Sequence, residues 1–170
     1  ANIHDFDNNP DYQVYEYLSI NRTYMTFNFE DEIVGNPLVR QAINLGVDRE
    51  GIYTRTMNGT GAVAKTFISP LFTDFVDDTY QLPSRDIEAA TKLLEEAGYQ
   101  KDKDGYYFTL DFDVFISGNY VDVATVVVEN VKDIGIKVRL NVMEYGAWLE
   151  KSTASHHFQV TMFAGYQGPD

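Results

Sequence analysis

The sequence predicts one α/β domain built on a mixed β-sheet, with a β-α-β-α-β unit in its C-terminal half. Two observations support this fold class. From residue 106 onward, segments with the pattern of strands alternate with segments that have the 3.6-residue period of helices. Helices that join strands in this way return the chain in the same direction, so the strands they connect lie parallel. The 170 residues, 44% of them hydrophobic, are also sufficient to bury a core.

The N-terminal part of the chain is predicted to contain a leader followed by two strands. Residues 1–11 are polar, and we expect them to form a coil leader before the domain proper, residues 12–170. Segment 12–19 shows an imperfect alternation of apolar and polar residues, and segment 22–29 is rich in residues that favour strands. The two residues between these segments predict the turn that joins them.

Two helices are then predicted from their capping residues. Asn36 can cap a helix that begins at Pro37 and ends near Gly46, because proline tolerates the first helical position. Asp48 can cap a second helix over residues 49–57, which an Asn-Gly pair ends.

A long irregular segment separates these helices from a third. Residues 60–83 have no clear period and contain two prolines, which predicts a loop. Ser84 is expected to begin the third helix, because Leu94 and the other apolar residues after it recur at helical spacing. Gly98 marks the C-terminal end of this helix.

The C-terminal half of the chain is predicted to alternate between strands and helices. The expected elements are, in order, strand 106–115, helix 120–134, strand 136–143, helix 145–154 and strand 158–164. Parallel strands all end at the same edge of a sheet, and open α/β sheets bind ligands beyond that edge. We therefore expect a binding site there.

The candidate binding residues are the polar and aromatic side chains that follow these strands. They are Ser117, Asn119, Glu144, Tyr145, Tyr166, Gln167 and Asp170. A tyrosine ring offers a flat apolar face together with a hydroxyl group, so Tyr145 and Tyr166 are expected to stack on a ligand. The other residues of the set are expected to form hydrogen bonds with it.

Composition and motifs argue against several function classes. The net charge is −13 and no cluster of Lys or Arg offsets it, which argues against binding to nucleic acid or to anionic lipid. The chain contains no cysteine, so it has neither disulfides nor a thiol nucleophile. Nucleophile and phosphate-loop motifs are absent, and adjacent His156 and His157 would point to opposite faces of an extended chain. We therefore predict no enzyme activity, no metal and no cofactor.

Two segments resemble a known protein family. Residues 36–49, NPLVRQAINLGVDR, resemble the (N/D)P-x-VRQAI-x-x-(A/G)-(I/V)-DR segment of the family-5 extracellular solute-binding proteins, the dipeptide and oligopeptide receptors of ABC importers. Residues 89–99, AATKLLEEAGY, are similar to the A-x-x-LL-x-EAGY helix of that family. Trp148 and the closing Gly-Tyr pair match in order, so the resemblance extends from about residue 12 to the last residue.

This resemblance implies a periplasmic-binding-protein-like lobe. Members of the family are longer and have two lobes, a hinge and a cleft, and this chain corresponds to the second lobe alone, as a fragment excised from such a protein. The implied partners are a small polar solute, the membrane permease of an ABC importer and the first lobe of the same polypeptide. The protein would be exported, and either periplasmic or lipid-anchored on the outer side of the cell membrane.

One position departs from the pattern of the family. Peptide receptors carry a G-W-x-x-D run whose Asp meets the ammonium group of the peptide. Here Gly165 and Tyr166 match the start of that run, Pro169 takes the place of the Asp, and Asp170 comes one residue late. The expected solute is therefore an oligopeptide or a similar polar molecule, with an oligosaccharide as the alternative. From other functional classes, a carboxylate-based hydrolase lobe and a structural interaction module such as an adhesin domain are the alternatives.

Overall fold

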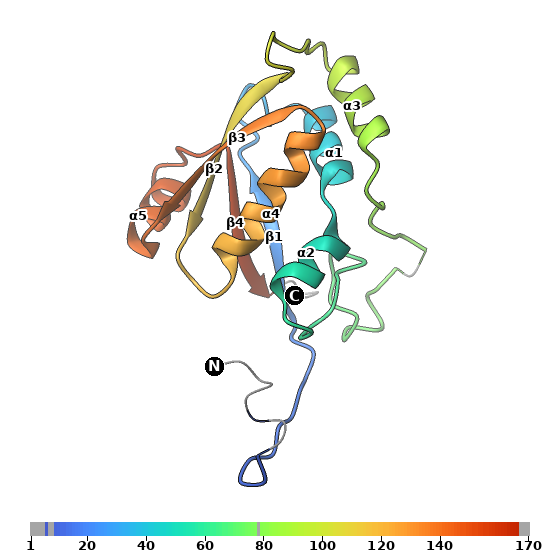
Figure 1. Cartoon of the computed structure of the whole chain (residues 1–170), viewed down its shortest axis with the longest axis vertical. Helices are drawn as coiled ribbons and strands as arrows, with labels where there is room; N and C mark the ends of the chain where they lie inside the picture. The colour runs from blue at the N-terminus through green and yellow to red at the C-terminus, as the bar shows by residue number, and fades with distance from the viewer. Residues whose placement is uncertain (1–5, 7–8, 78, 167–170) are drawn as a thin grey trace.

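A four-stranded mixed sheet lies at the centre of the computed structural model, which describes residues 6, 9–77 and 79–166 (Figure 1). The strand order is β1-β4-β2-β3. The strands are β1 (Asn21–Phe27), β2 (Phe108–Phe115), β3 (Ile136–Met143) and β4 (Val160–Tyr166). The helices are α1 (Pro37–Gly46), α2 (Arg49–Thr56), α3 (Ile87–Glu96), α4 (Tyr120–Asp133) and α5 (Tyr145–Leu149), and a π-helical turn (Glu150–Ala154) continues α5.

The predicted β-α-β-α-β unit is confirmed. Strands β2 and β3 pair in parallel and are joined by α4, whereas α5 and its π-helical turn carry the chain back across β2 to β4. Strand β1 pairs with β4 in the antiparallel direction, with Asn21 opposite Tyr166 and Phe27 opposite Val160. This single antiparallel pair makes the sheet mixed, as predicted.

The two faces of the sheet have different chemistry. One face is apolar: Leu110, Phe112 and Val114 of β2 pack in a continuous core with residues from α1, α3 and α4. Side chains alternate between the faces of a strand, so Asp111, Asp113 and Phe115 point to the opposite face. There α5 covers part of the surface, on the side of the sheet away from α4 and α1 (Figure 1). The second face thus carries the polar and aromatic groups.

The helix starts follow the side chains that cap them. The side chains of Asn36 and Asp48 accept hydrogen bonds of 2.9 Å from the backbone N–H groups of Leu38 and Gly51. The third helix was expected to begin at Ser84, and this expectation is wrong. Its cap is Asp86, whose carboxylate accepts from Ala89 N–H, so the helix begins at Ile87.

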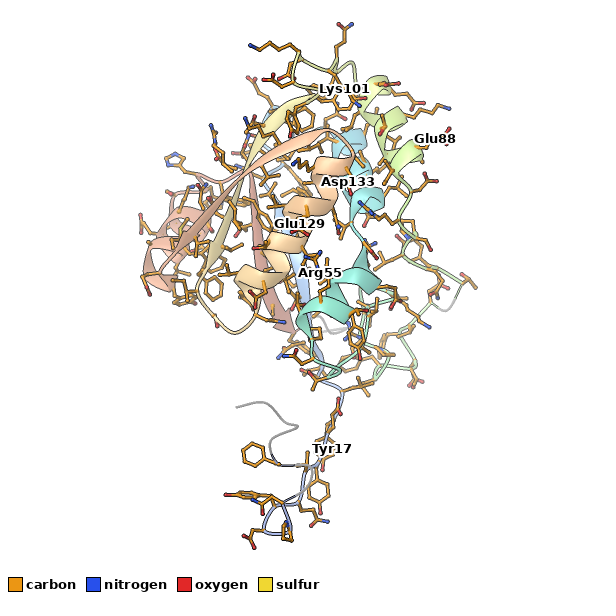
Figure 2. All side chains as sticks on the ribbon, viewed as in Figure 1. Tyr17, Arg55, Glu88, Lys101, Glu129 and Asp133 are labelled. Atoms are coloured by element: carbon orange, nitrogen blue, oxygen red, sulfur yellow. The ribbon has the colours of Figure 1, made fainter. Side chains whose placement is uncertain are left out.

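Two further expectations differ from the structure. Segment 12–19 forms no strand; its residues are exposed, as Tyr17 illustrates with 81% of its surface accessible, and the segment runs away from the sheet (Figures 1 and 2). A strand needs a paired neighbour, and segment 12–19 has none among the described residues, because β1 pairs with β4 instead. The predicted helix 145–154 is divided, because Ser155 N–H reaches back five residues to the carbonyl of Glu150 and turns the second half into a π-helix. Residues 60–83 contain no helix or strand where the structure describes them, as expected.

The burial of α3 gives a direct test of the core. Leu94 has none of its surface exposed and contributes to the main cluster of buried side chains. Replacing Leu94 by Ala removes this burial and leaves a cavity, so we expect a loss of about 2–5 kcal/mol of unfolding free energy. Urea unfolding followed by circular dichroism measures the change, with exposed Lys92→Ala on the same helix as the control. A loss below about 0.5 kcal/mol for Leu94→Ala would contradict this assignment of the buried face.

Candidate functional site

The carboxyl ends of the parallel strands meet at one edge of the sheet, as the sequence predicts. Phe115 at the end of β2 is opposite Met143 at the end of β3, and the backbone N–H of Ile116 donates to the carbonyl of Met143 at 3.0 Å. Strand β1 begins at the same edge, because Asn21 pairs with Tyr166 at the end of β4. We call this region the carboxyl edge. It is formed by all four strands.

Two of the predicted residues present aromatic rings at the carboxyl edge. Tyr145 is 52% exposed, and its ring lies 5.1 Å from Phe115 and 5.8 Å from Trp148, which it stacks on. Tyr166 is 43% exposed and lies 5.8 Å from Phe72 of the 60–83 loop in an edge-to-face contact. Each ring therefore has one side packed by neighbours and another open to solvent.

The predicted polar residues differ in whether their side chains already form hydrogen bonds within the fold. The side chains of Ser117 and Glu144 are exposed, and the structure shows no side-chain cap at Glu144 before α5. The amide of Asn119 donates to the carbonyl of Thr56 at 3.3 Å and approaches Met57 Sδ at 3.1 Å, so it ties the start of α4 to the end of α2. Asn119 thus has a structural role that the sequence did not indicate. Gln167 and Asp170 lie outside the described residues.

The sequence did not single out the aromatic group that continues from Tyr145. Trp148 stacks on Phe163 at 6.0 Å, and Phe163 meets Tyr24 of β1 at 5.9 Å. Gly165 explains how these rings approach the backbone, because a Cβ atom there would lie 2.9 Å from the Phe163 ring. The antiparallel pairing of β1 with β4 brings Tyr24 and Phe163 together. A prediction of that register would have been the signal for this group.

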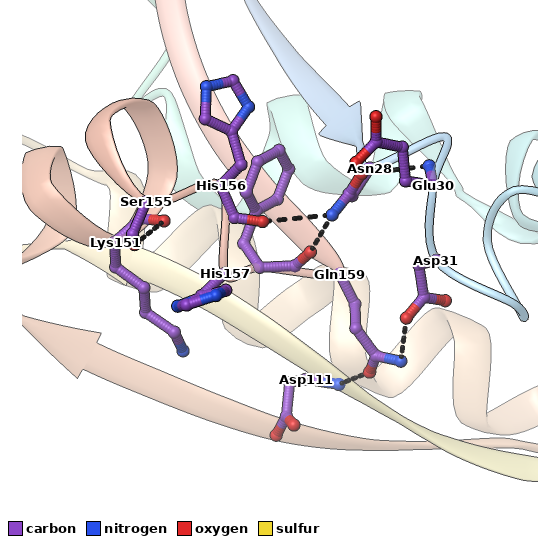
Figure 3. Close-up of a pocket in the computed structure, with 10 residues that line it drawn as sticks. Asn28, Glu30, Asp31, Asp111, Lys151, Ser155, His156, His157 and Gln159 are labelled. Carbon is purple, nitrogen blue, oxygen red and sulfur yellow. Dashed lines mark hydrogen bonds between the residues drawn. The ribbon is translucent and has the colours of Figure 1, made fainter.

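A hollow of about 470 Å³ lies at the other end of the sheet (Figure 3). Its amide side chains bond within the fold: Asn28 donates to the carbonyls of His156 and Phe158 at 3.2 and 3.0 Å, and Gln159 donates to Asp31 at 2.9 Å. These bonds connect the end of β1 to the start of β4. The hollow therefore differs in place from the predicted site, and its two amide side chains bond within the fold.

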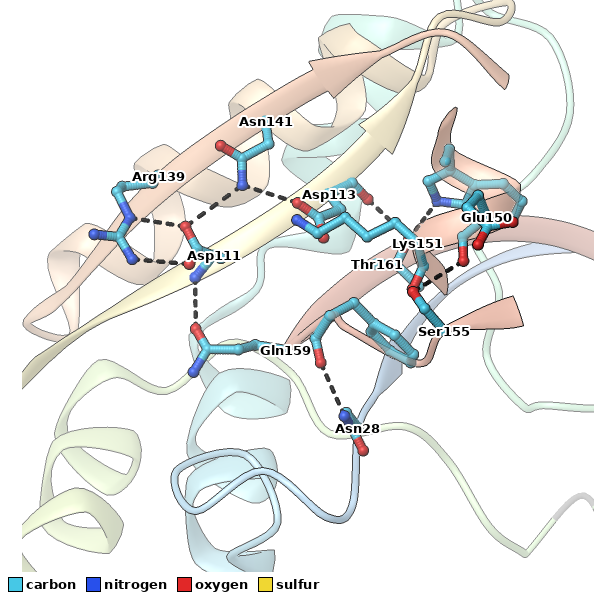
Figure 4. A network of polar contacts seen from close by, with 12 residues as sticks. Asn28, Asp111, Asp113, Arg139, Asn141, Glu150, Lys151, Ser155, Gln159 and Thr161 are labelled. Atoms are coloured by element: carbon cyan, nitrogen blue, oxygen red, sulfur yellow. Dashed lines mark hydrogen bonds and ion pairs between the residues drawn. The ribbon is translucent and has the colours of Figure 1, made fainter. Parts of the chain in front are cut away.

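A buried carboxylate on the second face holds α5 and its π-helical turn (Figure 4). Asp113 is fully buried; its carboxylate accepts from Asn141 Nδ2 at 2.8 Å and pairs with Lys151 Nζ at 2.6 Å. Its backbone carbonyl accepts from Thr161 Oγ1, which in turn accepts from Trp148 Nε1 at 2.6 Å. This network fixes Trp148 and, through it, the ring of Tyr145.

A second ion pair lies beside this network. Arg139 donates two hydrogen bonds to the carboxylate of Asp111, at 2.7 and 2.8 Å. These bonds, more than any other contact, lower the pKa of Asp111 from its ordinary value. Asp113 and Asp111 of this face thus each lie against a basic side chain. In the described part of the chain, no group of three or more His, Asp or Glu residues could hold a metal ion, and no helix is long and apolar enough to cross a membrane.

Comparison with known proteins gives one consistent result. Residues 1–170 match the family described as bacterial extracellular solute-binding proteins, family 5 Middle. The oligopeptide-binding protein AppA of Bacillus subtilis is 33% identical over 147 residues, which cover 79% of this chain and 26% of that protein. Heme-binding protein A of Haemophilus influenzae is 34% identical over 99 residues, covering 58% of this chain and 18% of that protein. The chain thus spans about a quarter or less of these relatives.

The solved structures agree with the sequence relatives. The structure of AppA from Bacillus subtilis in complex with a nonapeptide superposes with a TM-score of 0.79 and 28% identity, and covers 91% of this chain and 33% of that chain. The periplasmic-binding-protein-like α/β fold expected from the sequence is confirmed by this similarity.

The Asp113 network predicts a measurable role for Lys151. Lys151→Met leaves a buried carboxylate without its cation, so we expect a loss of about 2–4 kcal/mol of unfolding free energy. Trp148 is the one tryptophan of the chain, and its emission should shift to longer wavelength as α5 loosens. Urea unfolding followed by fluorescence measures both effects. The control is Lys103→Met, which removes an exposed lysine; equal behaviour of the two variants would show that the pair does not hold α5.

Proposed function

Because this chain belongs to the bacterial extracellular solute-binding proteins of family 5, we propose that it captures a polar organic solute for an ABC importer, as one lobe of a two-lobed receptor. The observation that carries the proposal is the pair of half-exposed rings, Tyr145 and Tyr166, at the carboxyl edge. Binding sites of open α/β sheets lie at this edge. Rings that pack on one side and face solvent on the other suit a ligand with flat or apolar parts.

The connections of the sheet support a cleft at the same place. Asn21 begins β1 and Tyr166 ends β4, and the two residues are paired neighbours. The chain therefore enters and leaves the sheet at the carboxyl edge. A first lobe joined through these two segments would face this edge, and closure of the lobes would enclose a solute between them.

An oligopeptide is the solute class we propose. The relatives are named for binding oligopeptide and haem, and one was solved with a nonapeptide. Peptides and haem both combine apolar surface with carboxylate groups. An oligosaccharide is the second candidate, favoured by the exposed tyrosine rings, since such rings stack on the apolar faces of sugars.

The roles of the individual residues follow from their positions. Tyr145 and Tyr166 would stack on the solute, and Ser117 and Glu144 would form hydrogen bonds with it. Asn119 would contribute only the bonding capacity that its contacts with α2 leave. Gln167 and Asp170 belong to the same proposal through their place in the sequence. A membrane permease would be the partner of the closed receptor, and the protein would be exported, periplasmic or anchored on the outer side of the cell membrane.

Tyr166 gives the first test of this site. In a protein that carries both lobes, Tyr166→Ala should weaken solute binding by about 1–3 kcal/mol, because a stacked aromatic ring is lost. Calorimetry with a tripeptide mixture and, separately, with a short oligosaccharide measures the effect and identifies the solute class. Tyr106→Ala, before the first residue of β2 and far from the carboxyl edge, is the matched control. Unchanged binding by Tyr166→Ala would remove this ring from the site.

The two-lobe arrangement has its own test. A ligand in a cleft is usually buried over most of its surface, and one lobe supplies about half of the contacts. We therefore expect the 170-residue chain alone to bind the same probes with dissociation constants of about a millimolar or weaker, and the two-lobed protein to bind them far more tightly. Calorimetry on both proteins compares them. Tight binding by the chain alone would show that the cleft needs no second lobe.

A further inference from the structure

Arg22 in β1 differs from every other arginine of the chain. Arg40, Arg49, Arg55, Arg85 and Arg139 each donate hydrogen bonds to backbone or side-chain acceptors. Arg22 has no hydrogen-bond or ion-pair partner among the described residues, although its Nε atom is buried. The chain has 26 acidic residues against 13 basic ones, and no carboxylate of the described residues pairs with Arg22.

A buried donor without an acceptor costs stability. The Nε–H of Arg22 loses water without gaining an acceptor, a loss that buried polar groups in proteins almost always avoid. Burial also lowers the pKa of Arg22 from its ordinary value. Such an unsatisfied group is explained if its acceptor is supplied by a bound molecule.

The position of Arg22 points to the candidate site. Arg22 pairs with Gly165 on β4, one step along the strands from the pair that Asn21 forms with Tyr166. Tyr24 lies two residues further on the same face and pairs with Phe163. Because Gly165 has no side chain, the strand opposite Arg22 offers only backbone, with the Phe163 ring and the Tyr24 hydroxyl over it. Arg22 thus occupies the position on β1 opposite Gly165, beside the Tyr24–Phe163 ring pair and near the carboxyl edge.

We propose that Arg22 binds a carboxylate group of the solute, while the rings of Tyr24 and Phe163, on the same face of the sheet, contact the apolar part of the same molecule. This inference rests on the proposed function. A guanidinium presents paired N–H donors that match the two oxygens of a carboxylate. A phosphate would match them too, but its higher charge is repelled more strongly by a chain of net charge −13. The solute class is therefore a carboxylate with aromatic or apolar substituents.

Matched probes test this assignment on the chain itself. N-acetylphenylalanine carries a carboxylate beside an aromatic ring, and its amide is identical except for the missing charge. Titration of each into the ¹⁵N-labelled chain, followed by NMR, should shift the Arg22 Nε–H signal and the backbone signals of Tyr24 and Tyr166 with the acid. We expect the acid to bind about tenfold more tightly than the amide, as charge-assisted hydrogen bonds require. Inorganic phosphate should compete more weakly than the acid.

Variants separate the carboxylate contact from general charge effects. Arg22→Gln should remove the difference between acid and amide while leaving amide binding unchanged, and Arg22→Lys should keep part of the difference because it keeps the charge. Arg55→Gln makes the same charge change in an exposed pair with Glu129 (Figure 2) and should behave as the original chain. The dispersion of each spectrum shows whether the variant is folded. If Arg22→Gln does not fold, the reduced difference between acid and amide in Arg22→Lys provides the test.

The outcomes distinguish the inference from the proposed function. Equal shifts of the carboxyl edge by acid and amide, or an acid–amide difference that survives in Arg22→Gln, would overturn the role of Arg22 and leave the edge as a binding site. Stronger competition by phosphate than by the acid would overturn the carboxylate assignment. No shift at the edge with any probe, in the chain alone and in the two-lobed protein alike, would contradict the proposed function itself, and the role of Arg22 with it.

Discussion

The buried carboxylate of Asp113 is the constraint on which the second face of the sheet depends. A fully buried carboxylate is costly unless a cation lies close to it. Lys151, in the π-helical turn after α5, places its Nζ atom 2.6 Å from the carboxylate of Asp113. The Asp113–Lys151 pair holds α5 and its π-helical turn against a face of the sheet that would otherwise be polar and exposed to solvent. Trp148 then fills the space between Phe115 and Phe163, and Tyr145 stacks on Trp148. The positions of Trp148 and Tyr145 thus depend on this ion pair together with the bond from Trp148 to Thr161.

The elements that sequence predicts best are those whose ends are decided locally. Asn36, Asp48 and Gly98 act within one turn of their own helices, so the pattern around them is sufficient. Segment 12–19 has a strand-like composition, but whether it pairs depends on a neighbour that composition does not reveal. Ser84 and Asp86 are both good caps, and only tertiary contacts choose between them: Asp86 N–H donates to the carbonyl of Leu45 in α1. Long-range bonds of this kind are not visible in a local pattern.

The residues of the candidate site likewise fall into those that the sequence predicts and those that depend on long-range contacts. The rule that parallel strands end together is topological, so Tyr145 and Tyr166 could be placed at one edge before any coordinates were known. Asn119 looked equally available, yet its amide is directed toward Thr56, a residue more than sixty positions away. The sequence did not predict Arg22 and Tyr24 as site residues, because β1 pairs with the last strand of the chain. Only that antiparallel register places them beside Gly165 and Phe163.

The division of the sheet into two faces explains how one lobe can be stable and still leave aromatic groups exposed. The apolar face buries the side chains of β2 against α1, α3 and α4, and these supply the hydrophobic stabilisation of the fold. The second face is then free to hold charges and rings whose exposure costs stability. Tyr24 and Phe163 of this face lie on β1 and β4, the two strands through which the chain enters and leaves the sheet at the carboxyl edge. In the proposed two-lobed receptor, a solute bound there would touch the two strands that connect the lobes, so solute capture and lobe closure would act on the same residues.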